Sequence, residues 1–389
     1  MNEAVIVSCV RTPVGRGRQD GALASVHPID MSSAVLRAAV ERAGVEPGMV
    51  DDVLMGCAMP ESSQGLNVAR LAVLRSGFPV HVPAVTINRF CSSGIQSVAM
   101  AAQAIMTGME DVVVAGGVEM MSQVPMSGFH TRLHPEMAEA YIGMGFTAER
   151  VARRWNISRA DQDAWALDSH RKAVAAWQAG RFDGQIVPIP VEHPHWEGAA
   201  RQAETTMVTR DELPRSDTSL EKLARLRPSF LPDGTVTAGN ASPFSDGAAA
   251  LVLMSRQRAE AEGITPLARF VNYAVAGVEP DIMGVGPIEA VPKVLARAGL
   301  KLEDIALIEF NEAFASQVLA VSRDLGLDPD RVNVNGGAIA LGHPLGATGA
   351  KLTTQLVHEL GRRGGGLGMV TMCIGGGMGA AGIFEVFPA

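Results

Sequence analysis

The hydrophobic pattern of the chain changes in the middle of residues 83–109. PAVTINRF (83–90) contains β-branched residues, which favour a strand. Beyond it, apolar residues recur at spacings of three and four, which predicts an amphipathic helix on Ile95, Val98, Ala102, Ile105 and Met109. Cys91 therefore lies at a helix N-terminus, where N–H groups and the helix dipole lower a thiol's pKa. An unpaired cysteine in an apolar chain is more often inert core, so it is this position that favours a nucleophile.

The chain also contains a weak internal repeat with an offset of about 250 residues. The segment 41–56 has the order helix end, glycine and strand, and the segment 296–309 repeats it. Further matches follow in the same order: VTIN (85–88) with VNVN (332–335), CSSG (91–94) with GATG (346–349), and VAGGVE (114–119) with CIGGGM (373–378). The repeat predicts two copies of one unit rich in βαβ segments.

The two copies differ between the strand and the helix. Two residues separate VTIN from CSSG, whereas ten, GGAIALGHPL (336–345), separate VNVN from GATG. The longer connection contains His343. If the two helix starts face each other by pseudo-symmetry, this insertion brings His343 over Cys91, where it can act as a base. Taken alone, a histidine in a glycine-rich loop is more often a surface or structural residue.

Residues from about 120 to 243 have no partner in the other copy and hold all four tryptophans. Within them, the segment 158–180 predicts a capped helix, with Ser158 as the N-cap, Asp161 in the first turn and Gly180 after the end. The residues from about 120 to 243 are expected to form a separate subdomain. An anionic, partly aromatic ligand is one interpretation of their arginines and tryptophans, although such residues more often form core edges and solvated faces.

Composition describes an ordinary globular protein and excludes several classes. The 389 residues are 47% hydrophobic and 19% charged, with a net charge of −8, which argues against a nucleic-acid-binding protein. No basic and apolar leader precedes the first strand, and no long uncharged apolar run predicts a membrane span. The four cysteines, Cys9, Cys57, Cys91 and Cys373, lack metal-site spacing. We expect reduced thiols, no metal and a cytoplasmic protein.

Together these stretches resemble the thiolase family, of the 3-ketoacyl-CoA thiolase (acetyl-CoA acyltransferase) type. The resemblance covers essentially the whole chain and rests on six motifs: NRFCSSG (88–94), GVEMMSQVPM (117–126), GNASPFSDGAAA (239–250), NEAFA (311–315), GGAIALGHPLGATGA (336–350) and CIGGGMG (373–379). It implies an α/β fold, a five-layered αβαβα sandwich of two duplicated βαβαβαββ halves with an inserted loop domain. We expect the N-terminal half at 1–119 and 244–265, the CoA-binding loop domain at 120–243 and the C-terminal half at 266–389.

The resemblance also implies the chemistry. Thiolysis of a 3-ketoacyl thioester needs a nucleophile for the keto carbon and stabilisation of the departing enolate. By resemblance, Cys91 is the nucleophile, His343 takes its proton, and Cys373 protonates the enolate and deprotonates the incoming CoA thiol. One oxyanion hole would use His343 and a water held by Asn311, and the other the N–H groups of Cys91 and Gly375.

Binding residues and partners follow from the same resemblance. Ser242, Arg215 and Met144 match positions that bind CoA or line the acyl pocket. Biosynthetic acetoacetyl-CoA enzymes typically have histidine where this chain has Gly143, which favours a longer or bulkier acyl group here. The implied substrates are CoA and 3-ketoacyl-CoA, with no permanently bound cofactor. The implied assembly is a homodimer or homotetramer, with the strand before Cys91 a candidate contact and a multifunctional β-oxidation enzyme a candidate partner.

Four alternatives remain open. A biosynthetic thiolase, which condenses two acetyl-CoA molecules, shares the same motifs. A non-catalytic acyl-CoA-binding relative is expected to lack a catalytic residue, and none is missing here. A ketoacyl synthase generally pairs its cysteine with two histidines, which Cys373 argues against. A dinucleotide-binding enzyme is disfavoured because no GxGxxG follows the first strand.

Overall fold

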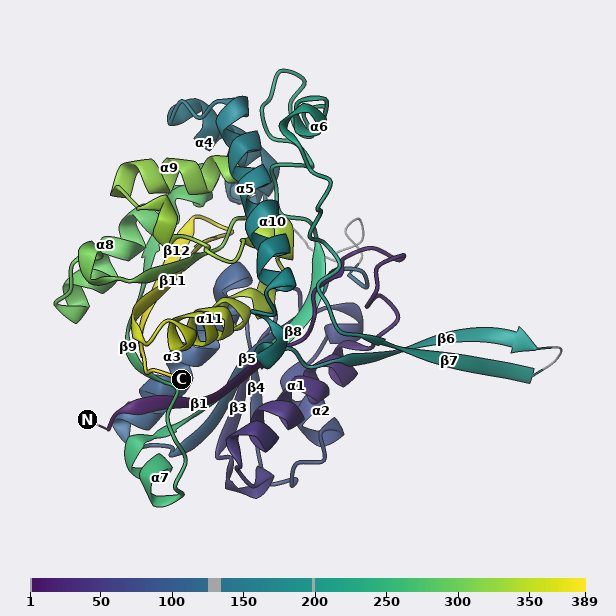
Figure 1. Cartoon of the computed structure of the whole chain (residues 1–389), viewed down its shortest axis with the longest axis vertical. Coiled ribbons are helices and arrows are strands. Elements are labelled where there is room, and N and C mark those ends of the chain that lie inside the picture. The colour runs from purple at the N-terminus through teal and green to yellow at the C-terminus, as the bar shows by residue number, and fades with distance from the viewer. Residues whose placement is uncertain (1, 125–133, 198–199) are drawn as a thin grey trace.

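The computed structural model describes residues 2–124, 134–197 and 200–389 (Figure 1). The last two residues of the GVEMMSQVPM motif, 125–126, and the side chain of Trp196 lie outside the described part. In the described part, no helix is long and apolar enough to cross a membrane. Nor does any group of three or more His, Cys, Asp or Glu side chains in that part form a candidate metal site.

The N-terminal part of the chain forms a mixed sheet together with one strand from much further along the chain. Its strands are β1 (Ala4–Arg11), β2 (Gly15–Arg16), β3 (Asp52–Gly56), β4 (Ala84–Ile87), β5 (Val112–Met120) and β8 (Ser245–Ser255). The order is β4-β3-β5-β8-β1, and β2 pairs with β8. β3 runs parallel to β4 and β5, whereas β8 runs antiparallel to β5 and β1. β8 therefore completes this sheet from beyond the inserted segment.

The C-terminal part repeats this order. Its strands are β9 (Ala268–Gly277), β10 (Leu307–Phe310), β11 (Gly366–Ile374) and β12 (Met378–Val386). The order is β10-β11-β12-β9, which matches β3-β5-β8-β1 strand for strand and direction for direction. The VNVN segment, the counterpart of β4, makes a single parallel bridge from Val332 to Ile308. The duplication read from the sequence is thus visible in the strand order.

Two central helices separate the two sheet halves. α3 (Ser93–Thr107) and α11 (Leu345–Arg362) share one hydrophobic core with residues of both halves, among them Leu251 of β8 and Met372 of β11. Two residue pairs between β1 and β9 join the halves at one edge into a continuous ten-stranded sheet. α3 ends at Thr107 before the left-handed Gly108, so the expectation that Met109 belongs to the helix is wrong; Met109 is 82% exposed.

The outer faces of the two halves are covered by further helices. α1 (Pro28–Ala43) and α2 (Val68–Arg75) pack on the N-terminal half, and α8 (Gly286–Ala298) and α9 (Ala315–Leu325) pack on the C-terminal half. The layers are therefore helix, sheet, helix, sheet and helix. This confirms the expected αβαβα sandwich, which arises because each half buries both faces of its sheet.

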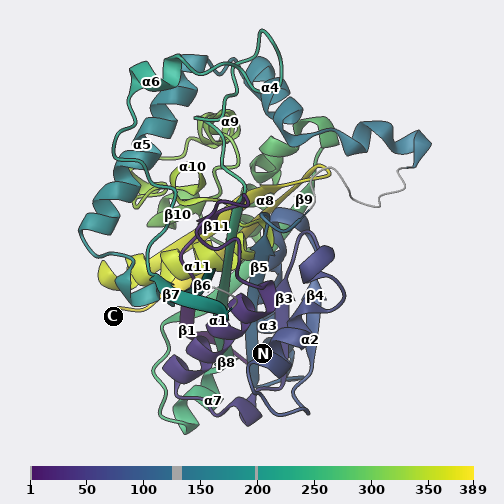
Figure 2. The same ribbon diagram turned by 90° about the vertical axis from the view of Figure 1, so that its right-hand side faces the viewer.

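The remaining elements lie mostly in the inserted segment. They are α4 (Met144–Arg154), α5 (Arg159–Gln178), β6 (Ile189–Glu197), β7 (Ala200–Val208) and α6 (Leu220–Ala224), with α7 (Arg256–Ala261) and α10 (Ala338–Leu341) outside it. Ser158 Oγ accepts the Asp161 N–H (3.1 Å), which confirms the predicted cap of α5. The β6–β7 ribbon projects from the body (Figure 1), and α4, α5 and α6 gather at the end opposite α7 (Figure 2).

Candidate active site

Cys91 lies in a single 3-10 turn (Phe90–Ser92) between β4 and α3, which confirms its predicted position. Phe90 has a positive φ of 45°, which is uncommon for a residue with a side chain. Short polar side chains hold this turn: Asn88 Oδ1 accepts the Phe90 N–H (2.8 Å), and Ser93 Oγ donates to the Phe90 carbonyl (2.7 Å). These neighbouring side chains therefore fix the position of Cys91 at the start of α3.

The cysteines of two motifs meet at the end of β11. Cys373 is fully buried on this strand, and the N–H of Gly375 faces the Cys91 thiol and lowers its pKa. Cys91 keeps some exposed surface as a residue, but burial of its sulfur raises the pKa to about 11, and the N–H donors lower it only partly. Burial and the neighbouring Cys91 raise the pKa of Cys373 well above its ordinary value. The expected lowering of the Cys91 pKa is therefore wrong for the free protein, because desolvation outweighs the helix N-terminus.

His343 is held on three sides in the loop before α11. Its backbone N–H donates to Ser245 Oγ (3.1 Å). In its ring, Nδ1 lies 2.6 Å from Thr348 Oγ1, and Nε2 lies 3.3 Å from Asn311 Nδ2. An imidazole that accepts the Asn311 amide at Nε2 carries its proton on Nδ1 and donates it to Thr348. Burial, and then the charge of Lys351, lower the pKa of His343 to about 3. At neutral pH the imidazole is therefore an uncharged proton acceptor.

Asn311 follows directly after β10 and is completely buried. Its N–H donates to the carbonyl of Thr371 on β11 (3.0 Å), which ties it to the strand that carries Cys373. Within the described residues, Asn311 Oδ1 has no hydrogen-bond partner. A buried amide oxygen left unpaired costs about 1–3 kcal/mol, so this atom is suited to a further donor, such as a water or a substrate group.

Glycines allow the first turns of α3 and α11 to pack directly against each other. A Cβ added at Gly94 would lie 2.7 Å from the backbone of α11, and one at Gly349 would overlap the backbone of α3. Both positions therefore need glycine. Gly94 and Gly349 are the matching glycines of CSSG and GATG, so the repeat places the helix that follows Cys91 beside the helix that follows His343.

Glu119, which the sequence did not single out as a site residue, links the ends of several elements. Its buried carboxylate accepts the N–H groups of Ala58 (2.8 Å) and Met59 (3.2 Å) after β3, and that of Gly346 (2.9 Å) in the first turn of α11. It also accepts the side-chain amide of Gln64. A carboxylate with several N–H donors at a helix N-terminus stabilises that end, so Glu119 fixes the start of α11 just after the histidine loop.

Met144 and Phe90 both lie close to Gly375. A Cβ at Gly375 would lie 3.7 Å from Met144 Sδ and 3.9 Å from the ring of Phe90. The two side chains are 36% and 41% exposed, respectively. Together they form a small apolar wall beside Gly375.

An aromatic strip continues this wall. The rings of Phe146 and Phe230 are 6.1 Å apart, and those of Phe230 and Phe314 are 6.3 Å apart, both edge to face. Phe314 packs in the small apolar cluster that contains Cys373. Three scattered segments supply the rings, which is why the sequence alone did not reveal the strip.

The two remaining predicted residues lie at different places. Ser242 donates both its N–H (3.0 Å) and its Oγ hydroxyl (3.1 Å) to the carbonyl of Ala313, inside the NEAFA motif and two residues after Asn311. Arg215 is exposed, and its backbone N–H donates to His170 Nδ1 (3.2 Å). The structure therefore brings Ser242 to the site, whereas no hydrogen bond within the described residues links Arg215 to it.

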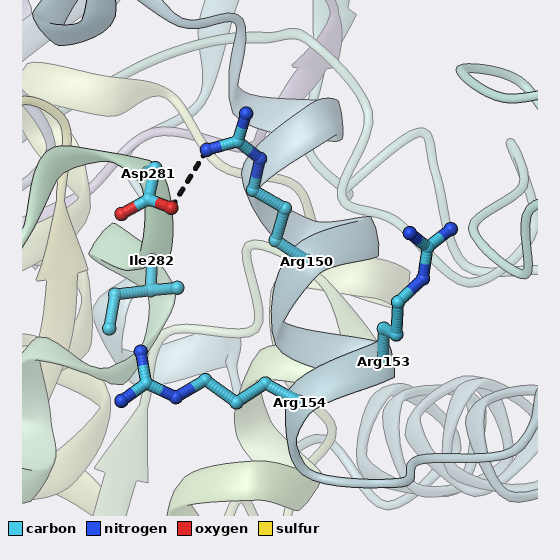
Figure 3. A pocket seen from close by; sticks show the side chains of 5 residues that line it. All are labelled: Arg150, Arg153, Arg154, Asp281 and Ile282. Atoms are coloured by element: carbon cyan, nitrogen blue, oxygen red, sulfur yellow. Dashed lines mark hydrogen bonds and ion pairs between the residues drawn. The ribbon is translucent and has the colours of Figure 1, made fainter.

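Two open hollows of the surface have no cysteine among their lining residues. One of about 480 Å³ is lined by Gly277, Val278, Glu279 and Glu289. Another, of about 310 Å³, lies between α4 and the turn at 280–285, where Arg150 pairs with Asp281 at 2.7 Å (Figure 3). Neither of these hollows is lined by a candidate site residue, so the candidate active site follows from the meeting of the motifs.

The fold and these motifs place the chain in a known enzyme family. The family model described as "Thiolase, N-terminal domain" matches residues 4–257, and the one described as "Thiolase, C-terminal domain" matches residues 264–386. The chain belongs to the thiolase family of acyltransferases.

Individual relatives agree with this assignment. The chain is 52% identical to a Bacillus subtilis protein named 3-ketoacyl-CoA thiolase, across 99% of this chain and 100% of that one. It is 46% identical to an acetyl-CoA acetyltransferase of Pseudomonas aeruginosa, across 98% of each chain. The crystal structure of an acetyl-CoA acetyltransferase from Bacillus anthracis superposes with a TM-score of 0.89 at 44% identity, covering 100% of this chain and 99% of that one.

Proposed function

We propose that the protein cleaves 3-ketoacyl-CoA with CoA, giving acetyl-CoA and an acyl-CoA shortened by two carbons. The proposal rests on one arrangement: the Cys91 thiol and the buried Cys373 meet at Gly375, while His343, in the loop before α11, contacts Asn311, which follows β10. These are the groups that a two-step acyl transfer through a thioester needs.

In the first half-reaction, His343 Nε2 takes the proton of Cys91 as the sulfur attacks the keto carbon. The bond between C2 and C3 then breaks, which leaves the acyl group on Cys91 as a thioester. The electron pair of that bond departs with the acetyl-CoA enolate, and Cys373 protonates its carbon. Because Cys91 and His343 are both uncharged in the free protein, proton transfer accompanies attack on the substrate and does not precede it.

The second half-reaction reverses these roles. The thiolate of Cys373 takes the proton of the incoming CoA thiol, whose sulfur attacks the acyl thioester. The tetrahedral intermediate collapses, the bond to Cys91 breaks, and His343 returns its proton to the Cys91 sulfur. The N–H groups of Cys91 and Gly375 are the proposed donors to the oxygen of this intermediate, and the lowering effect of both N–H groups on the Cys91 pKa supports that role.

The enolate oxygen needs a second set of donors. We assign it to the protonated His343 together with a water held by Asn311. The unpaired Asn311 Oδ1 and the short distance to His343 Nε2 support this assignment. Both groups are buried, so hydrogen bonds to the developing charge form in a poorly solvated site, where they are stronger.

CoA is proposed to enter along the apolar strip beside Met144. Ser242 lies at the NEAFA segment and is assigned to the pantetheine arm, while the exposed Arg215 is assigned to the phosphates, which pair readily with a guanidinium group. No permanently bound cofactor takes part in these steps, because the cysteine and CoA sulfurs supply the nucleophiles.

The degradative direction is favoured over acetoacetyl-CoA synthesis by Gly143. This residue is the N-cap of α4, directly before Met144, and a side chain there would contact the ring of Phe146 at 3.4 Å. The absence of that side chain leaves space along the apolar wall.

A ladder of 3-ketoacyl-CoA substrates tests the proposal. Each methylene buried in an apolar pocket contributes about 0.8 kcal/mol, or roughly fourfold, so thiolysis kcat/KM should rise from acetoacetyl-CoA to medium-chain substrates. A maximum at acetoacetyl-CoA would support the biosynthetic alternative. Binding without turnover of any substrate would support the non-catalytic one.

Three further assignments complete the proposal. We propose the three-part division at 1–119 with 244–265, 120–243 and 266–389, which the place of β8 between β1 and β5 supports. We propose a homodimer or homotetramer built through β4, an edge strand whose outer side pairs with no strand in the described part of the chain. Association with a multifunctional β-oxidation enzyme and a cytoplasmic location stay predictions.

A further inference from the structure

A charged side chain that none of the proposed steps uses is buried behind His343. Lys351 lies in the second turn of α11 and is only 1% exposed. Its Nζ lies 3.5 Å from the carbonyl oxygen of Gly342, the residue directly before His343. Gly342 has a φ of +84°, and a side chain there would crowd Ser245 Oγ at 2.6 Å. The carbonyl that faces Lys351 therefore belongs to a turn with little freedom to move.

Four other charged groups face Lys351 from the surrounding elements: Arg11 of β1, Asp211, Glu309 of β10 and Glu312. Arg11 and Asp211 already form a buried bidentate pair at 2.8 and 3.0 Å. Glu312 accepts hydrogen bonds from Trp165, Ser169, Asn333 and the N–H of Ile339. Two of the three carboxylates are thus occupied by other partners.

Glu309 is the exception among these carboxylates. It is completely buried two residues before Asn311, and neither of its oxygens has a hydrogen-bond partner within the described residues. Burial raises the pKa of Glu309 to about 8, and the charge of Lys351 opposes that rise. Burial and Arg11 lower the pKa of Lys351 to about 8. At neutral pH Lys351 therefore keeps its positive charge, and Glu309 keeps its proton and faces the ammonium group as a neutral carboxylic acid.

We propose that Lys351 is a positioning residue for His343: its buried ammonium group holds the Gly342 carbonyl and disfavours a proton on the imidazole. This inference rests on the proposed role of His343 as the base. It explains why a lysine is kept in the buried first half of α11, where an unpaired charge is costly. A cation beside an imidazole makes the imidazolium a stronger acid.

The charge of Lys351 should affect the rates of the two half-reactions in opposite directions. Acylation puts a proton on His343, so the charge of Lys351 opposes it. Deacylation returns that proton to Cys91, so the same charge favours it. Lys351→Met removes the charge and keeps the length of the side chain. It should speed acylation and slow deacylation, each by about threefold, for a change of about one unit in the pKa of His343 under Brønsted behaviour.

Rapid-quench mass spectrometry measures the two steps separately. The acyl mass on Cys91 is followed after mixing with an acyl-CoA, and its loss is followed after CoA is added to the acyl-enzyme. Lys351→Arg retains the charge and should return both rates toward those of the wild type. Lys293→Met, on the outer helix α8, removes an equal charge from an exposed site and should change neither rate.

The variants separate the possible outcomes. Opposite changes in the two rates support the inference, whereas slowing of both steps, or unchanged rates, in Lys351→Met overturns it. If Lys351→Met fails to fold, the double variant Lys351→Met with Glu309→Leu also removes the unpartnered buried carboxyl group that faces residue 351, and it carries the same expectation. A wild-type enzyme that never acquires the acyl mass on Cys91 refutes the proposed function, and this inference with it.

Discussion

The Nδ1 atom of His343 lies 2.6 Å from the Oγ1 atom of Thr348, five residues further along the chain in the first turn of α11. This contact fixes the orientation of the ring and leaves Nε2 facing the Asn311 amide at 3.3 Å. The rigid part is the helix, whose start is held by Glu119 and by the packing of Gly349 on α3. The base is thus positioned by the helix that follows it.

Thr348→Val should lower kcat for thiolysis by about tenfold, because it removes the hydrogen bond to Nδ1 and keeps the shape of the side chain. Thr348→Ser keeps the hydroxyl and should retain most of the activity. Steady-state kinetics on one 3-ketoacyl-CoA, with the melting temperature of each variant, check this. Equal activity in Thr348→Val and wild type would show that the contact does not orient the base.

Cys373→Ser should separate acylation from turnover. A serine hydroxyl has a far higher pKa than a thiol, so proton transfer to the enolate and from CoA fails, and thiolysis should fall by at least about a hundredfold. Cys91 should still accept an acyl group from a simple acyl-CoA. Full steady-state thiolysis in this variant would place the second acid and base elsewhere.

Cys91 should react only slowly with iodoacetamide at neutral pH, because almost none of it is thiolate in the free enzyme. Burial raises the pKa of Cys91 to about 11, so the reactive fraction grows as the pH rises toward that value. The inactivation rate should increase about tenfold per pH unit between about pH 7 and pH 9. A plateau already below about pH 8 would reveal a preformed thiolate and imidazolium pair instead.

Gly143→His should flatten the dependence of kcat/KM on acyl-chain length. The imidazole would lie against Phe146 and occupy space beside Met144, while Cys91 and Cys373 stay unchanged. The slope of log kcat/KM against chain length is compared with that of the wild type. Gly143→Ala, which adds only a methyl group, is the matched control, and an unchanged slope in Gly143→His would remove this position from the acyl pocket.

Much of this arrangement can be predicted from the sequence where local patterns determine it. The change from β-branched residues to helical spacing correctly placed Cys91 between β4 and α3, and the internal repeat agrees with the strand order of the two sheet halves. The inferred meeting of the two helix starts has a physical basis in Gly94 and Gly349.

The rest of the site could not be predicted, because it depends on burial and contacts in the folded protein, which a short sequence motif does not reveal. The helix N-terminus suggested a lowered pKa for Cys91, but enclosure of the sulfur reverses the direction. Glu119 and Lys351 gain their importance from backbone groups and charges far away in the chain. Thr348 lay inside a recognised motif, and its hydroxyl, five residues after the histidine in the first turn of the following helix, could have indicated it.

The account stands on Cys91 as the residue that carries the acyl group. Incubation of the enzyme with an acyl-CoA, followed by digestion and mass spectrometry, should show one acyl mass on the peptide that contains Cys91. Cys91→Ala should abolish the adduct, because no other thiol meets the Gly375 N–H in the described part of the chain. An adduct that persists on Cys373, or on any other residue of Cys91→Ala, would contradict the account.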